Sequence, residues 1–113
     1  MDATQGIESA YTQIIVPRMP ELLALCQRLR VRRLDLFGSA VNERFDPAHS
    51  DLDFLVDFEP MPPGPHARSC RDLHAGLEAL FGRTVDLLTE GALVNPYLQW
   101  QIDSEKRQLF PAP

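Results

Sequence analysis

The segment from Asp51 to Phe58 constrains the fold most, because its polarity alternates with the period of a β-strand. The even-numbered positions from Leu52 to Phe58 are all apolar, and the odd-numbered series begins with Asp51 and Asp53. Successive side chains of a strand point to opposite faces. One face of this strand is therefore expected to enter a hydrophobic core, while the other begins with two carboxylates that point the same way.

The two carboxylates indicate a cation between them. Two like charges about 4 Å apart repel each other by roughly 4 kcal/mol at an effective dielectric constant near 20. Hard oxygen ligands of this kind suit Mg²⁺. We therefore expect Asp51 and Asp53 to bind one or two Mg²⁺ ions; the alternative is a solvated strand end where the two charges repel only mildly.

A Gly-Ser pair, Gly38-Ser39, follows the apolar run that ends at Phe37. Glycine lets a backbone turn tightly and approach a phosphate group closely. The Ser39 hydroxyl and the amides of a following helical turn would donate to an anion. A turn glycine with a serine cap is the simpler alternative, but the nearby aspartates favour metal-assisted chemistry on a nucleotide.

Two further residues are candidates for the same site. In the expected strand 84–89, Val85 and Leu87 point to one face and leave Asp86 on the other. Arg44 lies in the loop after Ser39, where its fork of donors would reach a β- or γ-phosphate. The alternatives are a polar residue on an open sheet face for Asp86 and an ordinary surface arginine for Arg44.

The rest of the pattern predicts a single α/β domain over residues 1–113. We expect a mixed sheet of about three to four strands with helices packed on one face. The N-terminal segment 1–16 shows no clear pattern, and the proline-rich stretch 59–66 predicts a loop. The expected elements are, in order, helix 20–30, strand 33–37, strand 51–58, helix 67–81, strand 84–89, helix 96–105 and a short strand 108–110.

Charge and hydropathy limit the partners and the compartment that we expect for this chain. A net charge of −5 argues against direct nucleic-acid binding, which needs basic surface. No stretch approaches the ~20 apolar residues of a membrane span, and no signal sequence is evident at the N-terminus. We therefore expect a cytoplasmic protein without membrane contact. Cys26 and Cys70 fall on apolar helix stripes and are expected to be reduced core residues.

Taken in order, these motifs resemble the minimal nucleotidyltransferase family of the DNA polymerase beta-like nucleotidyltransferase superfamily. The family pattern is a Gly-Ser pair, a loop, Asp-x-Asp on the next strand and a third Asp on a later strand. Here these are Gly38-Ser39, Asp51-Leu52-Asp53 and Asp86. The loop between Ser39 and Asp51 holds eleven residues, one more than the commonest spacing, which affects its expected path more than the metal site.

The resemblance implies the chemistry and the partner. The family fold and activity would make the chain a nucleotidyltransferase that moves AMP from ATP to a hydroxyl. Asp51, Asp53 and Asp86 would hold the Mg²⁺, with Asp86 on the ion that activates the attacking hydroxyl. Because the chain shows no second domain, we expect the acceptor on a partner protein. Family members that act as antitoxins imply a tyrosine of a HEPN-type ribonuclease toxin, in a hetero-oligomer.

Two other functions stay open at this point. The chain would act as a catalytically idle antitoxin that binds its partner by contact alone, or as a small-molecule nucleotidyltransferase. An Asp-x-Asp-x-Thr phosphohydrolase is disfavoured because Leu55 stands where the threonine belongs. An exposed apolar patch on the last helix or the N-terminus would favour a protein partner over a small molecule.

Overall fold

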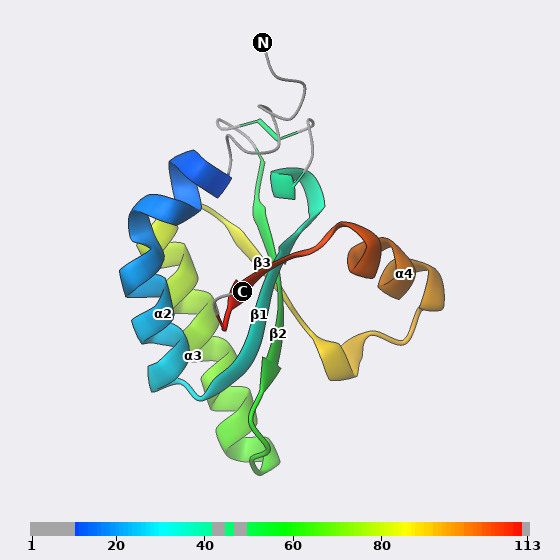
Figure 1. The fold of residues 1–113 in the computed structure, drawn as a ribbon. Helices are drawn as coiled ribbons and strands as arrows, with labels where there is room; N and C mark the ends of the chain where they lie inside the picture. Colours follow the sequence, from blue (N-terminus) through cyan, green and yellow to red (C-terminus); the bar gives the residue numbers. More distant parts are fainter. Residues whose placement is uncertain (1–10, 42–44, 47–49, 112–113) are drawn as a thin grey trace.

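The fold is built on a four-stranded mixed sheet with strand order β3-β2-β1-β4 (Figure 1). It was obtained as a computed structural model, which describes residues 11–41, 45–46 and 50–111. The central strand β2 is antiparallel to β1 and parallel to β3, and β1 is also antiparallel to β4. The expected α/β class with a mixed sheet is confirmed. The strands are β1 (Val31–Phe37), β2 (Leu52–Phe58), β3 (Val85–Thr89) and β4 (Arg107–Phe110).

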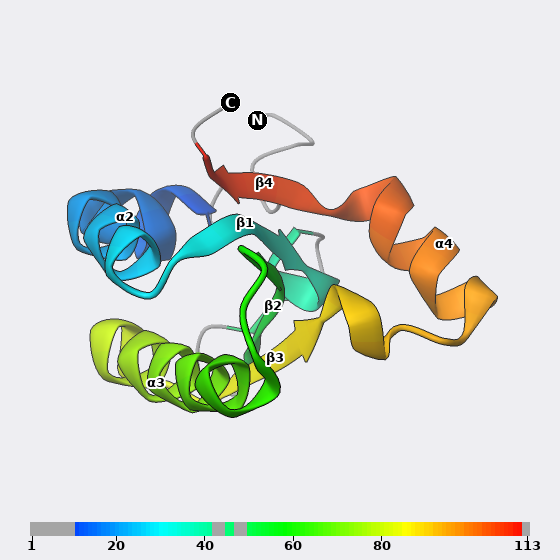
Figure 2. The same ribbon diagram turned by 90° about the horizontal axis from the view of Figure 1, so that it is seen from below.

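The helices lie on both faces of this sheet. Helices α2 (Met19–Arg28) and α3 (Pro63–Phe81) cover one face side by side, as predicted. Helix α4 (Pro96–Glu105) lies against the other face (Figure 2), which corrects the expectation that all helices share one face. The reason is that this second face is not entirely polar: Ile102 of α4 packs there on Phe37 and Leu55.

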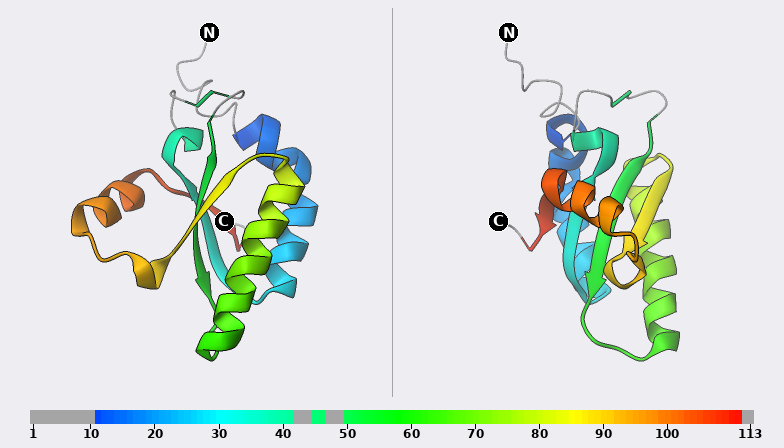
Figure 3. Two further views of the ribbon diagram at one scale, coloured as in Figure 1. Left: turned by 180° about the vertical axis from the view of Figure 1, so that it is seen from behind. Right: turned by 90° about the vertical axis from the view of Figure 1, so that its right-hand side faces the viewer.

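Short helical turns connect the regular elements. Two of them precede α2, one follows β1 and one follows β3. The turn after β1 lies at the end of the sheet where β2 begins (Figure 3). These turns are a π-helical turn at Tyr11–Ile15 and 3₁₀ turns at Val16–Arg18, Gly38–Val41 and Glu90–Ala92. None of the helices in the described ranges is both long and apolar enough to traverse a bilayer.

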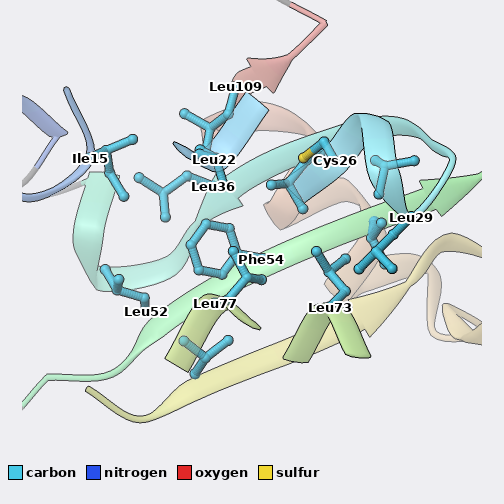
Figure 4. Packing of buried hydrophobic residues seen from close by; sticks show 14 of the residues in the cluster. Ile15, Leu22, Cys26, Leu29, Leu36, Leu52, Phe54, Leu73, Leu77 and Leu109 are labelled. Carbon is cyan, nitrogen blue, oxygen red and sulfur yellow. The ribbon is translucent and has the colours of Figure 1, made fainter. Parts of the chain in front are cut away.

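The main core lies between the sheet and the helices α2 and α3 (Figure 4). All four apolar side chains of the even-numbered series in β2 are buried, which confirms the alternation predicted from the sequence. Leu73 and Leu77 enter this core from α3, and Leu22 and Cys26 enter it from α2. Cys26 and Cys70 are both free thiols, and burial raises the pKa of Cys26 to about 12.

The proline-rich stretch is helical from Pro63 onward, so the expected loop 59–66 is shorter than predicted. The first turn of a helix leaves its N–H groups without intrahelical partners, and proline, which has no N–H, is tolerated there. Pro63 and Pro65 occupy that turn, and His66 N donates to Pro62 O at 2.9 Å. At the other end, Gly82 caps α3 in the left-handed conformation, at φ 63°.

Phe54 is the largest side chain that the sheet buries completely, so it offers a direct test of the core. Its ring stacks on Phe81 of α3 with the ring centroids 6.1 Å apart. The Phe54→Ala variant is expected to lose about 3–5 kcal/mol of unfolding free energy, because it removes this contact and leaves a cavity. Urea unfolding measures the loss. The control is Val94→Ala, which should change stability by less than about 0.5 kcal/mol because Val94 is 88% exposed.

Candidate functional site

The strand register brings the predicted site residues to one end of the sheet. Phe37, the last residue of β1, pairs with Asp53 of β2, and Asp53 pairs in turn with Asp86 of β3. Residues paired directly across neighbouring strands lie about 4.8 Å apart in the backbone and present their side chains to the same face. Gly38 follows Phe37 immediately. Three separate segments of the chain therefore meet around the Asp53 carboxylate.

The carboxylates of this site act on one another. Asp53 is partly buried, whereas Asp51 and Asp86 are exposed. Burial, followed by the charge of Asp86, a hydrogen bond between the two carboxyl groups and the charge of Asp51, raises the pKa of Asp53 to about 6. The structure thus places all three aspartates close enough for electrostatic coupling, and their roles remain predictions.

Gly38 is required at its position for two physical reasons. Its φ of +74° lies in the left-handed region that side chains other than glycine rarely adopt. A Cβ at this position would also overlap Oδ2 of Asp53 and would lie 3.0 Å from its Cγ. The turn that contains Gly38 and the partly exposed Ser39 is therefore packed directly on the Asp53 carboxylate.

The donors of the site suit Mg²⁺, although they do not form a closed ligand set. Among residues 11–41, 45–46 and 50–111, no three side chains of His, Cys, Asp or Glu converge as a complete metal centre would require. The hydrogen-bonded pair Asp53 and Asp86 nevertheless supplies carboxylate oxygens, the ligands that Mg²⁺ prefers. Burial and the charges of Asp86 and Asp51 raise the pKa of Asp53, and a bound cation would offset the repulsion between these carboxylates.

One predicted site residue lies outside the described residues, and two charged residues on neighbouring segments were not predicted. Arg44 lies outside the described residues, so its predicted phosphate contact stays a prediction. Asp35 in β1 is fully buried, and Arg33 Nε donates to its carboxylate at 3.0 Å. The sequence does contain a signal for Asp35, because it is a charged residue inside the apolar run Leu34–Phe37. Arg83, which contacts the backbone just before Asp51, left no comparable signal because its partner is 33 residues away.

Comparison with known proteins shows the class of this chain. The sequence profile of the nucleotidyltransferase domain family matches residues 22–109, a span that contains Gly38, Asp51, Asp53 and Asp86. The chain belongs to this family and is a nucleotidyltransferase. The resemblance to nucleotidyltransferases that the sequence motifs suggested is confirmed.

Individual relatives refine the comparison. A protein of Methanocaldococcus jannaschii, provisionally named a protein adenylyltransferase, is 34% identical over 82 residues, which are 72% of this chain and 79% of the relative.

Two solved structures share the fold at lower identity. A chain in the crystal structure of the toxin–antitoxin pair MntA–HpeT, a double aspartate-to-glutamate mutant, is similar with a TM-score of 0.56 and 17% identity. The match covers 81% of this chain and 72% of that one. A chain in the complex of the tri-AMPylated Shewanella oneidensis HEPN toxin with its MNT antitoxin is similar with a TM-score of 0.52 and 18% identity, over 83% and 70% of the two chains.

The raised pKa of Asp53 predicts how stability depends on pH. A carboxyl group whose pKa rises on folding stabilises the folded protein below its usual value of 3.8, and this contribution is lost as the pH rises through about 6. Metal-free Asp53→Asn, which cannot ionise, should therefore be more stable than the wild type at pH 8. The shift corresponds to roughly 3 kcal/mol, which solvent screening reduces to about 1 kcal/mol.

Urea unfolding in EDTA at pH 5 and pH 8 measures this difference. The advantage of Asp53→Asn should be larger at pH 8 than at pH 5. Asp57→Asn provides the control, since Asp57 lies on the same strand but pairs with Arg32 at 2.6 Å. An equal advantage of Asp53→Asn at both pH values would contradict the raised pKa of Asp53.

Proposed function

We propose that the chain is an Mg²⁺-dependent adenylyltransferase that moves AMP from ATP to a hydroxyl group of a partner protein. The observation that carries the proposal is the pairing of Asp53 with Asp86 beside the Gly38 turn. The family membership and the provisional name of the M. jannaschii relative support it. The acceptor oxygen would form a bond to the α-phosphorus of ATP, the bond to the leaving pyrophosphate would break, and the hydroxyl proton would pass to a base.

Each residue of the site has a part in this reaction. Asp51, Asp53 and Asp86 would hold the Mg²⁺, which supplies neutralisation of the triphosphate and a lowered pKa of the acceptor hydroxyl. The Gly38 turn lets the backbone approach the phosphates without a side chain in the way. Asp86 is exposed at the edge strand, where its carboxylate is available to accept the proton of an incoming hydroxyl.

The surface of α4 supports a protein as the acceptor. We call the exposed apolar residues on and just before this helix the α4 patch: Val94 is 88% exposed, Tyr97 85%, Leu98 39% and Trp100 72%. Exposed apolar patches mark interaction sites, and tryptophan and tyrosine dominate protein interfaces. This is the feature that favours a protein partner over a small-molecule acceptor.

The α4 patch also lies on a helix that is packed next to the site. Ile102, the buried residue of α4, contacts the cluster that contains Phe37, and Phe37 pairs with Asp53. A protein that covered the α4 patch would thus approach the same face of the sheet on which Asp53 and Asp86 lie. The helix would then hold the acceptor near the carboxylates.

The partner that we propose is a HEPN-type toxin, which would make this chain its antitoxin in a hetero-oligomer. Two structural neighbours are chains of toxin–antitoxin complexes, and one of these holds an AMPylated HEPN toxin with an MNT antitoxin. A tyrosine is the acceptor hydroxyl that we propose, with ATP as the donor and the cytoplasm as the compartment. An acidic net charge of −5 fits a protein partner better than a nucleic acid.

Intact-mass measurement of the proposed transfer tests this function. The chain is mixed with the product of its neighbouring gene, ATP and Mg²⁺, and both proteins are weighed. A gain of AMP units on the partner is expected. The double variant Asp51→Asn/Asp53→Asn should transfer at least about 100-fold more slowly, because it removes two of the carboxylates that would hold the Mg²⁺.

Asp57→Asn is the matched control for this experiment. Asp57 lies on the same face of β2 but about 13 Å further along the strand at 3.3 Å per residue, and it pairs with Arg32. Transfer by this variant should equal that of the wild type. A stable complex of the two proteins without any AMP on either would instead identify an idle binding module, and transfer to small alcohols alone would exclude the protein acceptor.

A separate prediction concerns the α4 patch. The double variant Tyr97→Ala/Trp100→Ala is expected to weaken binding of the partner by about 2 kcal/mol or more, roughly 30-fold in Kd, because it removes two exposed aromatic anchors. Calorimetric titration of the partner measures the loss. The melting temperature should stay nearly unchanged, since both side chains are exposed.

The control for the patch lies on the opposite face of the sheet. Asp72→Ala changes an exposed residue of α3 and should leave the affinity for the partner unaltered. Equal affinities of the wild type and the Tyr97→Ala/Trp100→Ala variant would show that the partner binds elsewhere.

A further inference from the structure

Arg83 links the start of β3 to the loop that precedes β2. It is partly buried and lies two residues before Val85, the first residue of β3. Its Nη1 donates to the backbone oxygen of Ser50 at 3.2 Å. Its guanidinium carbon also lies 5.3 Å from the centre of the Phe45 ring, within the range of a cation–π contact. One side chain thus contacts two points of the loop that runs toward Asp51.

The Ser50 end of this loop is tied down by several hydrogen bonds. Ser50 N donates to Asp46 O at 2.8 Å, and Asp46 N donates to Ser50 Oγ at 2.8 Å. On the other side of Asp51, Leu52 N donates to Thr84 O at 3.1 Å. The residues on both sides of Asp51 are therefore held by the adjacent residues Arg83 and Thr84.

The position of Arg83 is costly for an arginine. Its Nε is shielded from solvent and has no hydrogen-bond partner among the described residues. A buried donor without a partner destabilises the folded state. The compensating contacts are a directed hydrogen bond to Ser50 and a cation–π contact with Phe45, both made by the one guanidinium group.

These contacts matter because Asp51 has little support of its own. It is exposed, and it precedes β2, so it lies outside the hydrogen-bonded strand that holds Asp53. Asp86, by contrast, follows Arg83 by three residues and pairs with Asp53 in the sheet. The same short segment therefore carries one carboxylate of the site and restrains the backbone beside another.

We propose that Arg83 is a positioning residue, which holds the Ser50–Asp51 junction against the start of β3 and so keeps the Asp51 carboxylate beside Asp53 and Asp86. This inference rests on the proposed function only in that it assigns the three carboxylates to one Mg²⁺ site. Arg83 acts through the backbone of Ser50 and the ring of Phe45, without touching the reacting groups.

The test compares Arg83→Met with Arg83→Lys in the full chain. Methionine keeps an apolar stem but has no donor, whereas lysine restores a cationic donor for Ser50 O without the forked geometry of arginine. Hydrogen exchange in the metal-free protein is expected to accelerate about 10-fold at the Ser50 and Leu52 amides of Arg83→Met, because local opening becomes easier. Calorimetric titration with MgCl₂ alone should show about 10-fold weaker binding, the order expected for a residue that orients a ligand.

Arg83→Lys should recover part of the exchange protection and part of the Mg²⁺ affinity. A side chain that only filled space would give no such recovery. Arg71→Met, at an exposed site on α3, is the matched control and should alter neither measurement. Unchanged exchange at Ser50 and Leu52 in Arg83→Met would overturn the proposal. Faster exchange spread equally over α3 and the sheet, with no recovery in Arg83→Lys, would overturn it as well.

The outcomes separate this inference from the proposed function. Exchange and Mg²⁺ titration do not depend on AMP transfer. If the wild type transfers no AMP while Arg83→Met loosens the junction and weakens Mg²⁺ binding, Arg83 is a positioning residue and the proposed reaction is wrong. If the wild type transfers AMP but Arg83→Met binds Mg²⁺ as tightly as the wild type, the reaction stands and the role of Arg83 is refuted.

Discussion

The central strand β2 carries the constraint on which the rest of the molecule depends. It pairs with β1 on one side and β3 on the other, so its register decides which residues of three strands lie next to one another. A slip of one residue would turn its four buried apolar side chains toward the opposite face. The hydrophobic core beneath α2 and α3 therefore fixes the register, and the register places Asp53 between Phe37 and Asp86. Packing on one face of the strand thus positions the chemistry on the other.

The site itself works against the stability of the fold. Burial first, and then the charges of Asp86 and Asp51, raise the pKa of Asp53 to about 6. Gly38 adopts a left-handed conformation so that the turn fits against the same carboxylate. Features that cost stability and persist at one place are typical of functional sites. A bound cation would relieve the repulsion between the carboxylates, and a turn without a side chain leaves room for a phosphate chain, so the geometry agrees with the proposed reaction.

Helix α4, on the second face of the sheet, is mostly exposed. It is attached to this face through the buried Ile102, and most of its remaining surface is open to solvent. A helix with so little burial within its own chain gains most from a partner that covers it, because aromatic side chains contribute strongly once they are desolvated. The α4 patch and the carboxylates lie on the same face of the sheet. A partner protein that covered this helix would bring its acceptor to the face on which Asp53 and Asp86 lie, as the proposed function requires.

The sequence by itself determined the elements, the face that each strand buries and the family. The alternation in residues 51–58 gave β2 and its core face correctly, because that signal is local and periodic. The order of Gly38, Asp53 and Asp86 indicated a nucleotidyltransferase through its resemblance to the family pattern. The tertiary structure decided the rest. It placed α4 on the face opposite α3, since Leu55 and Phe37 needed cover that a two-residue period does not reveal. It also brought Arg83 to Ser50, a contact that depends on strand register and loop path across 33 residues. Periodicity within one element determines its faces, whereas contacts between distant elements follow only from how the whole chain packs.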